Sequence, residues 1–315
     1  MPDKMMRMQR AVPSQGSARR PRMLAIAGDS AAGKTTLTRG IVEALGAERC
    51  TAVCIDDYHR YDRQERKALP FSPLNPECNY VEVMEQHLQL LATGQPILKP
   101  VYDHADGSLV RPVLVEPADY VIGEGLLPLH TRLAQACFDV TVYVDPPDDV
   151  RRAWKVKRDT ADRGYGEEEV LASLTEREPD SEAFVRPQRS KADMVVRFSP
   201  IAGRDDPPDT PLSATLLLRS TISHPDLSVA LADSAPGAPM HLKMLRDDDG
   251  RPVDALHIHG YAPASDTEVV KKLIWDGLEV DAPLPPALGR LGDGQVSQPL
   301  AITQLILIHH LLKDG

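Results

Sequence analysis

Three absences narrow what this chain of 315 residues can be. It has no Cys-x-x-Cys pair and no metal-ligand spacing among its cysteines, which favours a reduced, cytoplasmic protein over a disulfide-rich secreted one. It has no apolar run long enough to cross a bilayer, so we expect no membrane partner. It also has no excess of basic residues: the net charge is −10, and because phosphate backbones reward clustered Lys and Arg, we expect no nucleic-acid partner.

The N-terminal segment is basic but has no apolar core, so we do not expect it to act as a secretory signal. We expect residues 1–22 to be a disordered basic tail, or an over-long start ahead of Met23. The whole chain is 42% hydrophobic and 26% charged, the profile of a soluble globular protein with ample length for a core.

The most informative stretch is Gly-Asp-Ser-Ala-Ala-Gly-Lys-Thr at positions 28–35, a G-x-x-x-x-G-K-[ST] phosphate-binding loop (P-loop). The apolar run before it predicts a buried parallel strand, and helical spacing of apolar residues predicts a helix after it. Glycines let the backbone wrap around a polyphosphate, and the N-terminus of the following helix attracts its negative charge. We therefore expect a nucleoside triphosphate and Mg²⁺ as ligands, with Lys34 on the β/γ-phosphates and Thr35 on the metal. The expected nucleotide-binding residues are Gly28, Asp29, Ser30, Ala31, Ala32, Gly33, Lys34, Thr35 and Thr36.

Acidic residues stand at the ends of two further predicted strands, at 51–55 and 120–125. In an open α/β sheet the carboxyl ends of the strands face the ligand crevice. Asp56 is therefore a candidate base and Glu124 a candidate partner for the metal. For the Asp56-Asp57 pair alone, a charged, solvated loop is the alternative interpretation.

Two groups of residues suit a phosphorylated hydroxyl substrate. His59 and Arg63 follow Asp56 directly, and Tyr102 and His104 lie on an extended piece that leads into an Asp-Gly turn, which predicts a hairpin. Alone, Tyr102 and His104 would be ordinary packing residues.

A basic helix is predicted over about 148–163, begun by Asp148 or Asp149 as a cap and ended by a glycine. Spacing places Lys155, Arg158 and Asp159 on one face, with Arg163 one turn after Asp159. A salt-bridged surface helix is the bland alternative. Residues 176–192 carry four basic residues and two prolines, which predicts a basic, mobile lid or loop, and 194–198 predict the last strand of the core.

In their order and spacing, residues 23–200 resemble the phosphoribulokinase and uridine kinase superfamily, and within it the phosphoribulokinases. The matching segments are the P-loop, Asp56-Asp57-Tyr58-His59 to Arg63, Lys99 to His104, Glu124-Gly125-Leu126, and Trp154 to Gly164.

The resemblance implies ATP-dependent phosphorylation of the C1 hydroxyl of ribulose 5-phosphate to ribulose 1,5-bisphosphate. By position it makes Asp56 the general base, Asp159 a second acid needed for turnover and Glu124 a metal-linked acid. It assigns the sugar phosphate or the transferring phosphate to His59, Arg63, Lys155, Arg158 and Arg163.

Two departures from the family pattern bear on these expectations. Leu127 stands where the family has His, which leaves the exact sugar open. The alternatives that we keep are a uridine-type nucleoside kinase, a kinase of another sugar phosphate, and a catalytically inactive ATP-binding regulatory protein. Cys54 matches one thiol-switch position of the photosynthetic enzymes but Ala32 occupies the other, so we expect no disulfide switch there.

We expect an α/β protein: a P-loop kinase core over 23–200, with a mostly parallel sheet flanked by helices, and a C-terminal α+β extension over 201–315. Alternation predicts strands at 214–221, 227–231, 241–245 and 253–259, then a helix ending near Trp275 and an apolar helix at 300–312. Because this last helix is apolar on most sides, we expect it to be buried or to face another subunit. We expect a homodimer or higher homo-oligomer.

Overall fold

The computed structural model describes residues 20–201, 203–204, 207, 210–231, 238–280, 282–291 and 294–313, apart from the side chains of 162, 163 and 313. The predicted tail therefore lies almost wholly outside the described residues. Within these ranges one eight-stranded sheet has the order β2-β5-β1-β6-β7-β8-β10-β9. Its first five strands are parallel and its last three antiparallel. In sheet order they are β2 (Cys50–Cys54), β5 (Tyr120–Gly125), β1 (Arg22–Gly28), β6 (Val140–Val144), β7 (Met194–Ser199), β8 (Ser213–Leu218), β10 (Pro252–Ile258) and β9 (Met240–Arg246).

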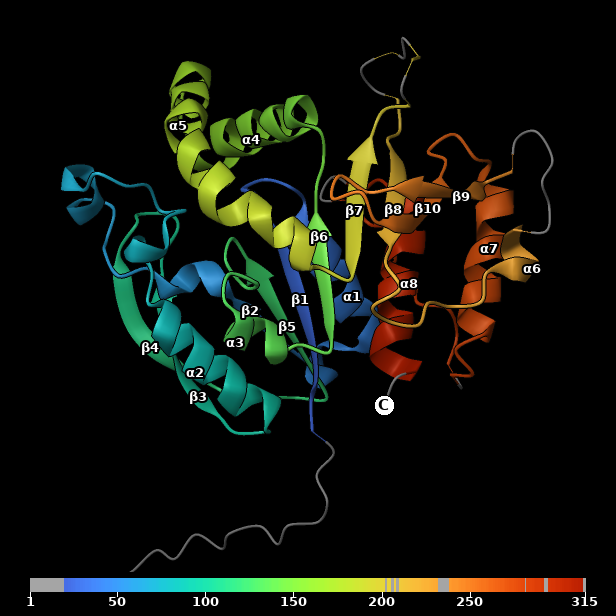
Figure 1. Ribbon diagram of the computed structural model, residues 1–315, viewed down its shortest axis with the longest axis horizontal. Coiled ribbons are helices and arrows are strands. Elements are labelled where there is room, and N and C mark those ends of the chain that lie inside the picture. The colour runs from blue at the N-terminus through green and yellow to red at the C-terminus, as the bar shows by residue number, and fades with distance from the viewer. Residues whose placement is uncertain are drawn as a thin grey trace, which may run out of the picture.

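Helices cover both faces of the sheet, because its strands are apolar on both sides. In β1, Leu24 and Ile26 enter the core under α1 (Lys34–Leu45), α7 (Ala264–Asp276) and α8 (Gln298–Lys313), whereas Met23 enters the core under α2 (Val81–Ala92) and α3 (Arg132–Ala136). In Figure 1, α1 and α8 lie to the right of β1 and α2 lies to its left. Among the described residues no helix has the length and apolarity that a bilayer crossing requires.

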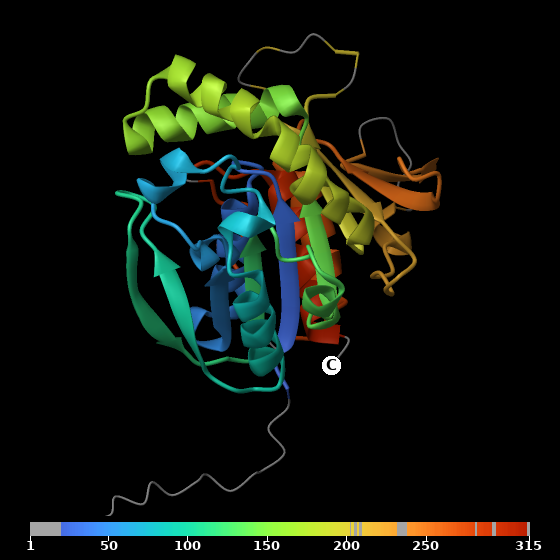
Figure 2. The same cartoon turned by 60° about the vertical axis from the view of Figure 1, so that its left-hand side comes forward.

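The carboxyl ends of β1, β2, β5 and β6 meet at one edge of the sheet, with the P-loop between β1 and α1 at its centre. Two helices, α4 (Asp148–Arg163) and α5 (Glu167–Asp180), lie across this edge, and a hairpin of β3 (Ile97–Tyr102) and β4 (Leu109–Val115) lies beside it (Figures 1 and 2). This is the predicted α/β kinase-type architecture with extra C-terminal elements.

The C-terminal third continues the sheet without interruption, because β7 pairs with β8 along its whole length. Helix α8 packs on α1, where the Gln304 side chain faces Gly40 and a Cβ at that glycine would lie only 2.0 Å from Gln304 Nε2. A buried ion-pair cluster joins the β9–β10 turn to the core: Arg189 Nη1 lies 2.7 Å from Asp247 Oδ1, and Arg219 binds the other oxygen.

Three local predictions were wrong. Residues 227–231 contain a short helix, α6 (Ser228–Leu231), instead of a strand. The predicted loop at 176–192 is helical, since α5 continues through a π-turn (Ser181–Val185) and a 3₁₀ turn (Arg186–Lys191). Neither Asp148 nor Asp149 caps α4, because α4 begins after Pro147 and Asp148 binds Arg151 and Arg152.

Candidate active site

The P-loop has the geometry that its glycines predict. Gly28 and Gly33 have φ values of 150° and 99°, and a Cβ at Gly28 would lie 2.6 Å from the carbonyl oxygen of Val144 on the neighbouring β6. No side chain caps α1, which leaves its first N–H groups for an anion. Lys34 is buried, and its Nζ donates to the carbonyls of Gly28 (2.8 Å) and Asp29 (2.9 Å). A phosphate in the loop would take over these lysine hydrogen bonds.

The Asp29 side chain anchors the loop to the helical segment after α5. Its carboxylate accepts hydrogen bonds of 2.7 and 2.9 Å from the Ser181 hydroxyl and lies 3.6 Å from Arg186 Nε. The sequence pattern gave no sign of Ser181, because the contact joins segments 152 residues apart. Asp29 can thus serve a nucleotide through its backbone, while its side chain fixes the position of the loop.

Oxygen ligands that suit Mg²⁺ converge beside the P-loop. Burial raises the pKa of Glu124, and the Lys34 charge and the hydroxyls of Thr35 and Thr38 oppose that shift. Thr38 Oγ1 donates to Glu124 Oε2 at 3.3 Å. Thr38 was not among the predicted residues, although its position three residues after Thr35 places it on the same helix face.

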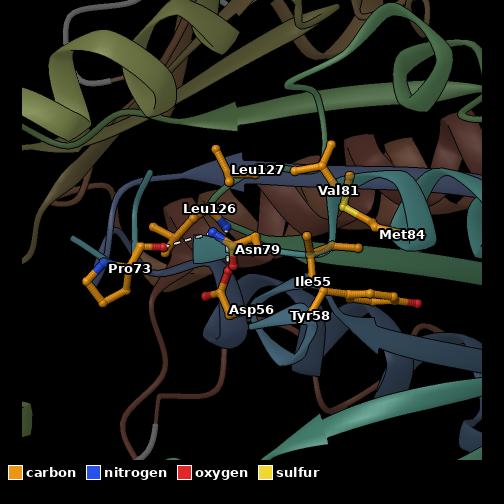
Figure 3. Close-up of a pocket in the computed structure, with 9 residues that line it drawn as sticks. All are labelled: Ile55, Asp56, Tyr58, Pro73, Asn79, Val81, Met84, Leu126 and Leu127. Atoms are coloured by element: carbon orange, nitrogen blue, oxygen red, sulfur yellow. Dashed lines mark hydrogen bonds between the residues drawn. The ribbon is translucent and has the colours of Figure 1, made fainter. Parts of the chain in front are cut away.

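Asp56 lies at one end of a pocket beside the carboxyl end of β5. Its Oδ1 accepts the backbone N–H of Leu126 at 2.7 Å, and a Cβ at Gly125 would lie 2.7 Å from that oxygen. The pocket is otherwise mostly apolar (Figure 3) and is lined by Ile55, Asp56, Tyr58, Pro73, Asn79, Val81, Met84, Leu126 and Leu127. Leu127 thus gives this pocket part of its apolar wall.

His59 is held neutral beside this pocket. Asn79 donates from Nδ2 to the carbonyls of Pro73 and Asn75, which turns its Oδ1 toward His59 Nδ1 at 2.7 Å. The proton on His59 is thereby assigned to Nδ1, leaving Nε2 as an acceptor. Burial, with the charge of Arg66 second, lowers the pKa of His59 to about 4. Asn79 therefore orients His59 and does not cap α2, which starts after Tyr80 without a side-chain cap.

Arg63 and Arg66 have different surroundings. The Arg63 guanidinium donates to the backbone carbonyls of His104 (2.9 Å) and Ala105 (3.3 Å), so it braces the β3–β4 hairpin. Arg66 stacks on the Tyr102 ring at 4.8 Å and donates to its hydroxyl. Its Nη1 is buried and has no hydrogen-bond partner among the described residues. Tyr102 also touches the His59 and His104 rings edge to face, at 4.8 and 5.0 Å, so these predicted substrate residues do meet.

Helix α4 presents the predicted cations to the P-loop. Lys155 and Arg158 both bind the Asp159 carboxylate, and Arg158 Nη2 reaches Ser30 Oγ at 3.5 Å. Burial lowers the pKa of Lys155 to about 8, against the opposing effect of Asp159. Held between two cations, Asp159 positions them more readily than it binds a metal. The side chain of Arg163 lies outside the described residues.

The sequence also gave no reason to select Arg177 on α5. It lines a second pocket with Lys155, Ser30 and Leu74, between α4, α5 and the P-loop. Burial and, next, the charge of Arg66 lower its pKa. The charge of Arg66 lowers the pKa of His59, on the Asp56 side of the cleft, as well as that of Arg177 on α5. Arg66 and Arg177 are thus positive groups placed for an anionic substrate.

Comparison with known proteins agrees with this geometry. The model of the Phosphoribulokinase / Uridine kinase family matches residues 23–202. A phosphoribulokinase of Synechocystis is 40% identical over 178 residues, covering 56% of this chain and 54% of the relative. A uridine kinase of Halobacterium salinarum is 31% identical over 177 residues, covering 55% of this chain and 78% of the relative.

The solved structure of phosphoribulokinase from Rhodobacter spheroides has the same fold. It superposes with a TM-score of 0.59 at 17% identity, covering 82% of this chain and 96% of that one. Against the curated phosphoribulokinases of Synechocystis and Arabidopsis thaliana, the chain spans about half of their length.

Proposed function

The chain belongs to the phosphoribulokinase/uridine kinase family, and on this premise we propose that it transfers the γ-phosphoryl group of ATP to the C1 hydroxyl of ribulose 5-phosphate. The observation that carries the proposal is the arrangement of cations around one cleft. Arg66 and Arg177 are partly buried, and neither forms an ion pair with a carboxylate among the described residues, although both lie beside a P-loop and a carboxylate at a strand end. An uncharged nucleoside would leave these charges unpaired, whereas the phosphate of a sugar phosphate would pair with them.

The proposed mechanism assigns proton removal to Asp56. The Leu126 N–H holds one carboxylate oxygen, and the other is left to accept the proton of the attacking hydroxyl. The neutral His59 accepts a hydrogen bond from a second sugar hydroxyl through Nε2. These groups orient the acceptor, and orientation is the main source of rate in phosphoryl transfer.

On the nucleotide side, Lys34 moves from the P-loop carbonyls to the β/γ-phosphates, and Arg158 and Lys155 face the group being transferred. Mg²⁺, held through Thr35 and Glu124, would supply neutralisation of phosphate charge. The carboxylate of Asp159 keeps both cations of α4 oriented toward Ser30. This set is more economically explained by catalysis than by an inactive ATP-binding protein, which would need neither Asp56 nor oriented cations.

A screen of acceptors tests the proposal. Wild-type protein with ATP and Mg²⁺ is offered ribulose 5-phosphate, other pentose and hexose phosphates, uridine and cytidine, and ADP release is followed by a coupled assay. We expect turnover with ribulose 5-phosphate and none with nucleosides. Turnover with uridine that survives in Arg66→Ala would establish the uridine-type alternative, and ATP binding without transfer to any acceptor would establish the regulatory one.

We also propose a homo-oligomeric protein that works in the cytoplasm. Strand β9 forms an edge of the sheet, and Leu242, Met244 and Leu245 on it are exposed. An uncovered apolar edge strand favours pairing with another strand. Light scattering tests this: Met244→Lys should shift the protein toward the monomer, while the exposed Val269→Lys on α7 should not.

A further inference from the structure

Three side chains of types that can bind metals lie beside the proposed acceptor pocket, and the mechanism proposed above gives none of them a step. Cys54 ends β2, Asp57 follows in a 3₁₀ turn, and His104 lies just beyond β3. One ligand atom from each, a thiol sulfur, a carboxylate oxygen and a ring nitrogen, lies within 4.8 Å of the other two. We propose that these three residues bind a thiophilic divalent cation, Zn²⁺ being the best match, next to Asp56.

The Asp57 carboxylate is oriented for such a role. Lys99 binds its Oδ2, and Oδ1 accepts a long hydrogen bond of 3.4 Å from the Tyr102 N–H while facing His104 Nε2 at 4.0 Å. One oxygen is therefore fixed by a neighbouring cation, and the other is directed at the remaining ligands. A second-shell partner of this kind commonly orients a ligating carboxylate. The positive charge of Lys99 weakens the affinity for a cation, but Lys99 does not bind the oxygen that faces the proposed site.

Electrostatics around the thiol favour a cation. The Cys54 pKa is raised by burial and then by the charges of Asp56, Asp57 and Glu124. Burial first, and these negative charges second, make a thiolate costly unless a positive ion compensates its charge. When a divalent metal binds, the thiol releases its proton to solvent and the sulfur takes the metal instead.

The donor set selects the metal. Sulfur and imidazole ligands favour Zn²⁺ and similar ions, whereas Mg²⁺ prefers oxygen alone. Tetrahedral Zn²⁺ with bonds of ~2.0–2.3 Å places its donors roughly 3.3–3.7 Å apart. Ligand atoms that lie within 4.8 Å of one another must therefore approach by up to roughly 1–1.5 Å. His104 can make that adjustment, since 43% of its side chain is exposed and it lies beyond the end of β3. Three protein ligands leave the fourth position open to water.

A bound ion would tie the hairpin to the end of β2 and place positive charge beside the proposed base. We therefore expect micromolar Zn²⁺ to inhibit turnover in wild-type protein and much less in Cys54→Ala. This consequence rests on the proposed function, but metal binding itself does not and is measured separately.

The binding test uses Co²⁺, whose bond to a thiolate gives a charge-transfer absorption band. Titration of the nucleotide-free protein should produce this band, Zn²⁺ should displace it, and excess Mg²⁺ should leave it intact. Cys54→Ser should abolish the band, and His104→Gln should weaken Co²⁺ binding ~10–100-fold. Cys50→Ser, at the other end of β2, is the matched control and should keep it. No band in the wild type, a band that survives Cys54→Ser, or displacement by Mg²⁺ would overturn the proposal, and circular dichroism verifies that each variant is folded.

Discussion

The backbone N–H of Leu126 donates to Asp56 Oδ1 at 2.7 Å, so the end of β5 sets the direction of the proposed base. The approach is close because residue 125 is glycine: a Cβ there would lie 2.7 Å from both Asp56 Oδ1 and Ile55 Cβ. Substrate orientation and base position thus depend on a backbone contact between two strand ends.

Gly125→Ala tests that dependence. The added methyl must displace Asp56, and a shift of ~1 Å costs about 10²-fold in rate, so kcat should fall about that much while ATP binding stays unchanged. Gly166→Ala is the control, because a Cβ at Gly166 meets no atom within 4 Å and its φ of −73° suits alanine. A Gly125→Ala enzyme with wild-type kcat would show that the contact does not position the base.

Arg66→Ala should weaken binding of the sugar phosphate. A charge-assisted hydrogen bond contributes ~1.5–3 kcal/mol, so KM for the acceptor should rise roughly 10–100-fold with little change in KM for ATP. Steady-state kinetics measure both constants, and the exposed Lys67→Ala serves as control. An unchanged acceptor KM would remove Arg66 from the site.

Arg63→Ala separates two interpretations of that arginine. The family resemblance predicts direct phosphate binding and hence a higher acceptor KM. The structure shows its guanidinium on the hairpin carbonyls of His104 and Ala105, which predicts a smaller effect than that of Arg66→Ala. Comparing the two variants at saturating ATP decides between them.

Asp247→Asn should destabilise the whole fold. The Asp247 side chain is 1% exposed between Arg189 and Arg219, which hold its pKa at about 2 against the effect of burial. Breaking a buried pair costs ~3–5 kcal/mol, so the free energy of unfolding should drop by about that amount. Asp249→Asn in the same turn should change it by less than ~0.5 kcal/mol. Chemical denaturation measures both, and equal effects would argue against a special role for the cluster.

Stability should fall as the pH drops from about 6.5 toward 4. His257 stacks on His241, and burial, followed by the positive charge of His241, lowers the His257 pKa to about 4. The unfolded chain binds the proton first, near pH 6.5, so the folded state loses stability through this interval and none above it. His257→Gln, which can keep a hydrogen bond to Thr215, should flatten the decline in melting temperature between pH 6.5 and 4.5. An identical decline in both proteins would assign it to other groups.

The sequence predicted the parts of the site that local patterns determine. The P-loop is a contiguous motif, and Asp56 and Glu124 follow from the rule that strand ends face the ligand crevice. The face of α4 that carries Lys155, Arg158 and Asp159 follows from helical spacing.

Long-range contacts escaped prediction because no local pattern encodes them. Ser181 binds Asp29 across 152 residues, and the cluster around Asp247 joins three segments distant in the chain. Arg66 looks like a surface arginine until the fold brings Tyr102 beneath it. Asn79 comes just before a helix, where asparagine is a common cap, but its side-chain oxygen instead forms a hydrogen bond with the His59 ring.

The most direct test of the account is phosphorus NMR of the reaction products. Wild-type protein, ATP, Mg²⁺ and ribulose 5-phosphate should yield ADP and a second phosphomonoester on C1. Asp56→Asn should bind ATP equally well and form this product ~10²–10⁴-fold more slowly. Unchanged ribulose 5-phosphate in the wild-type reaction, with uridine converted to its monophosphate under the same conditions, would contradict the sugar-phosphate assignment.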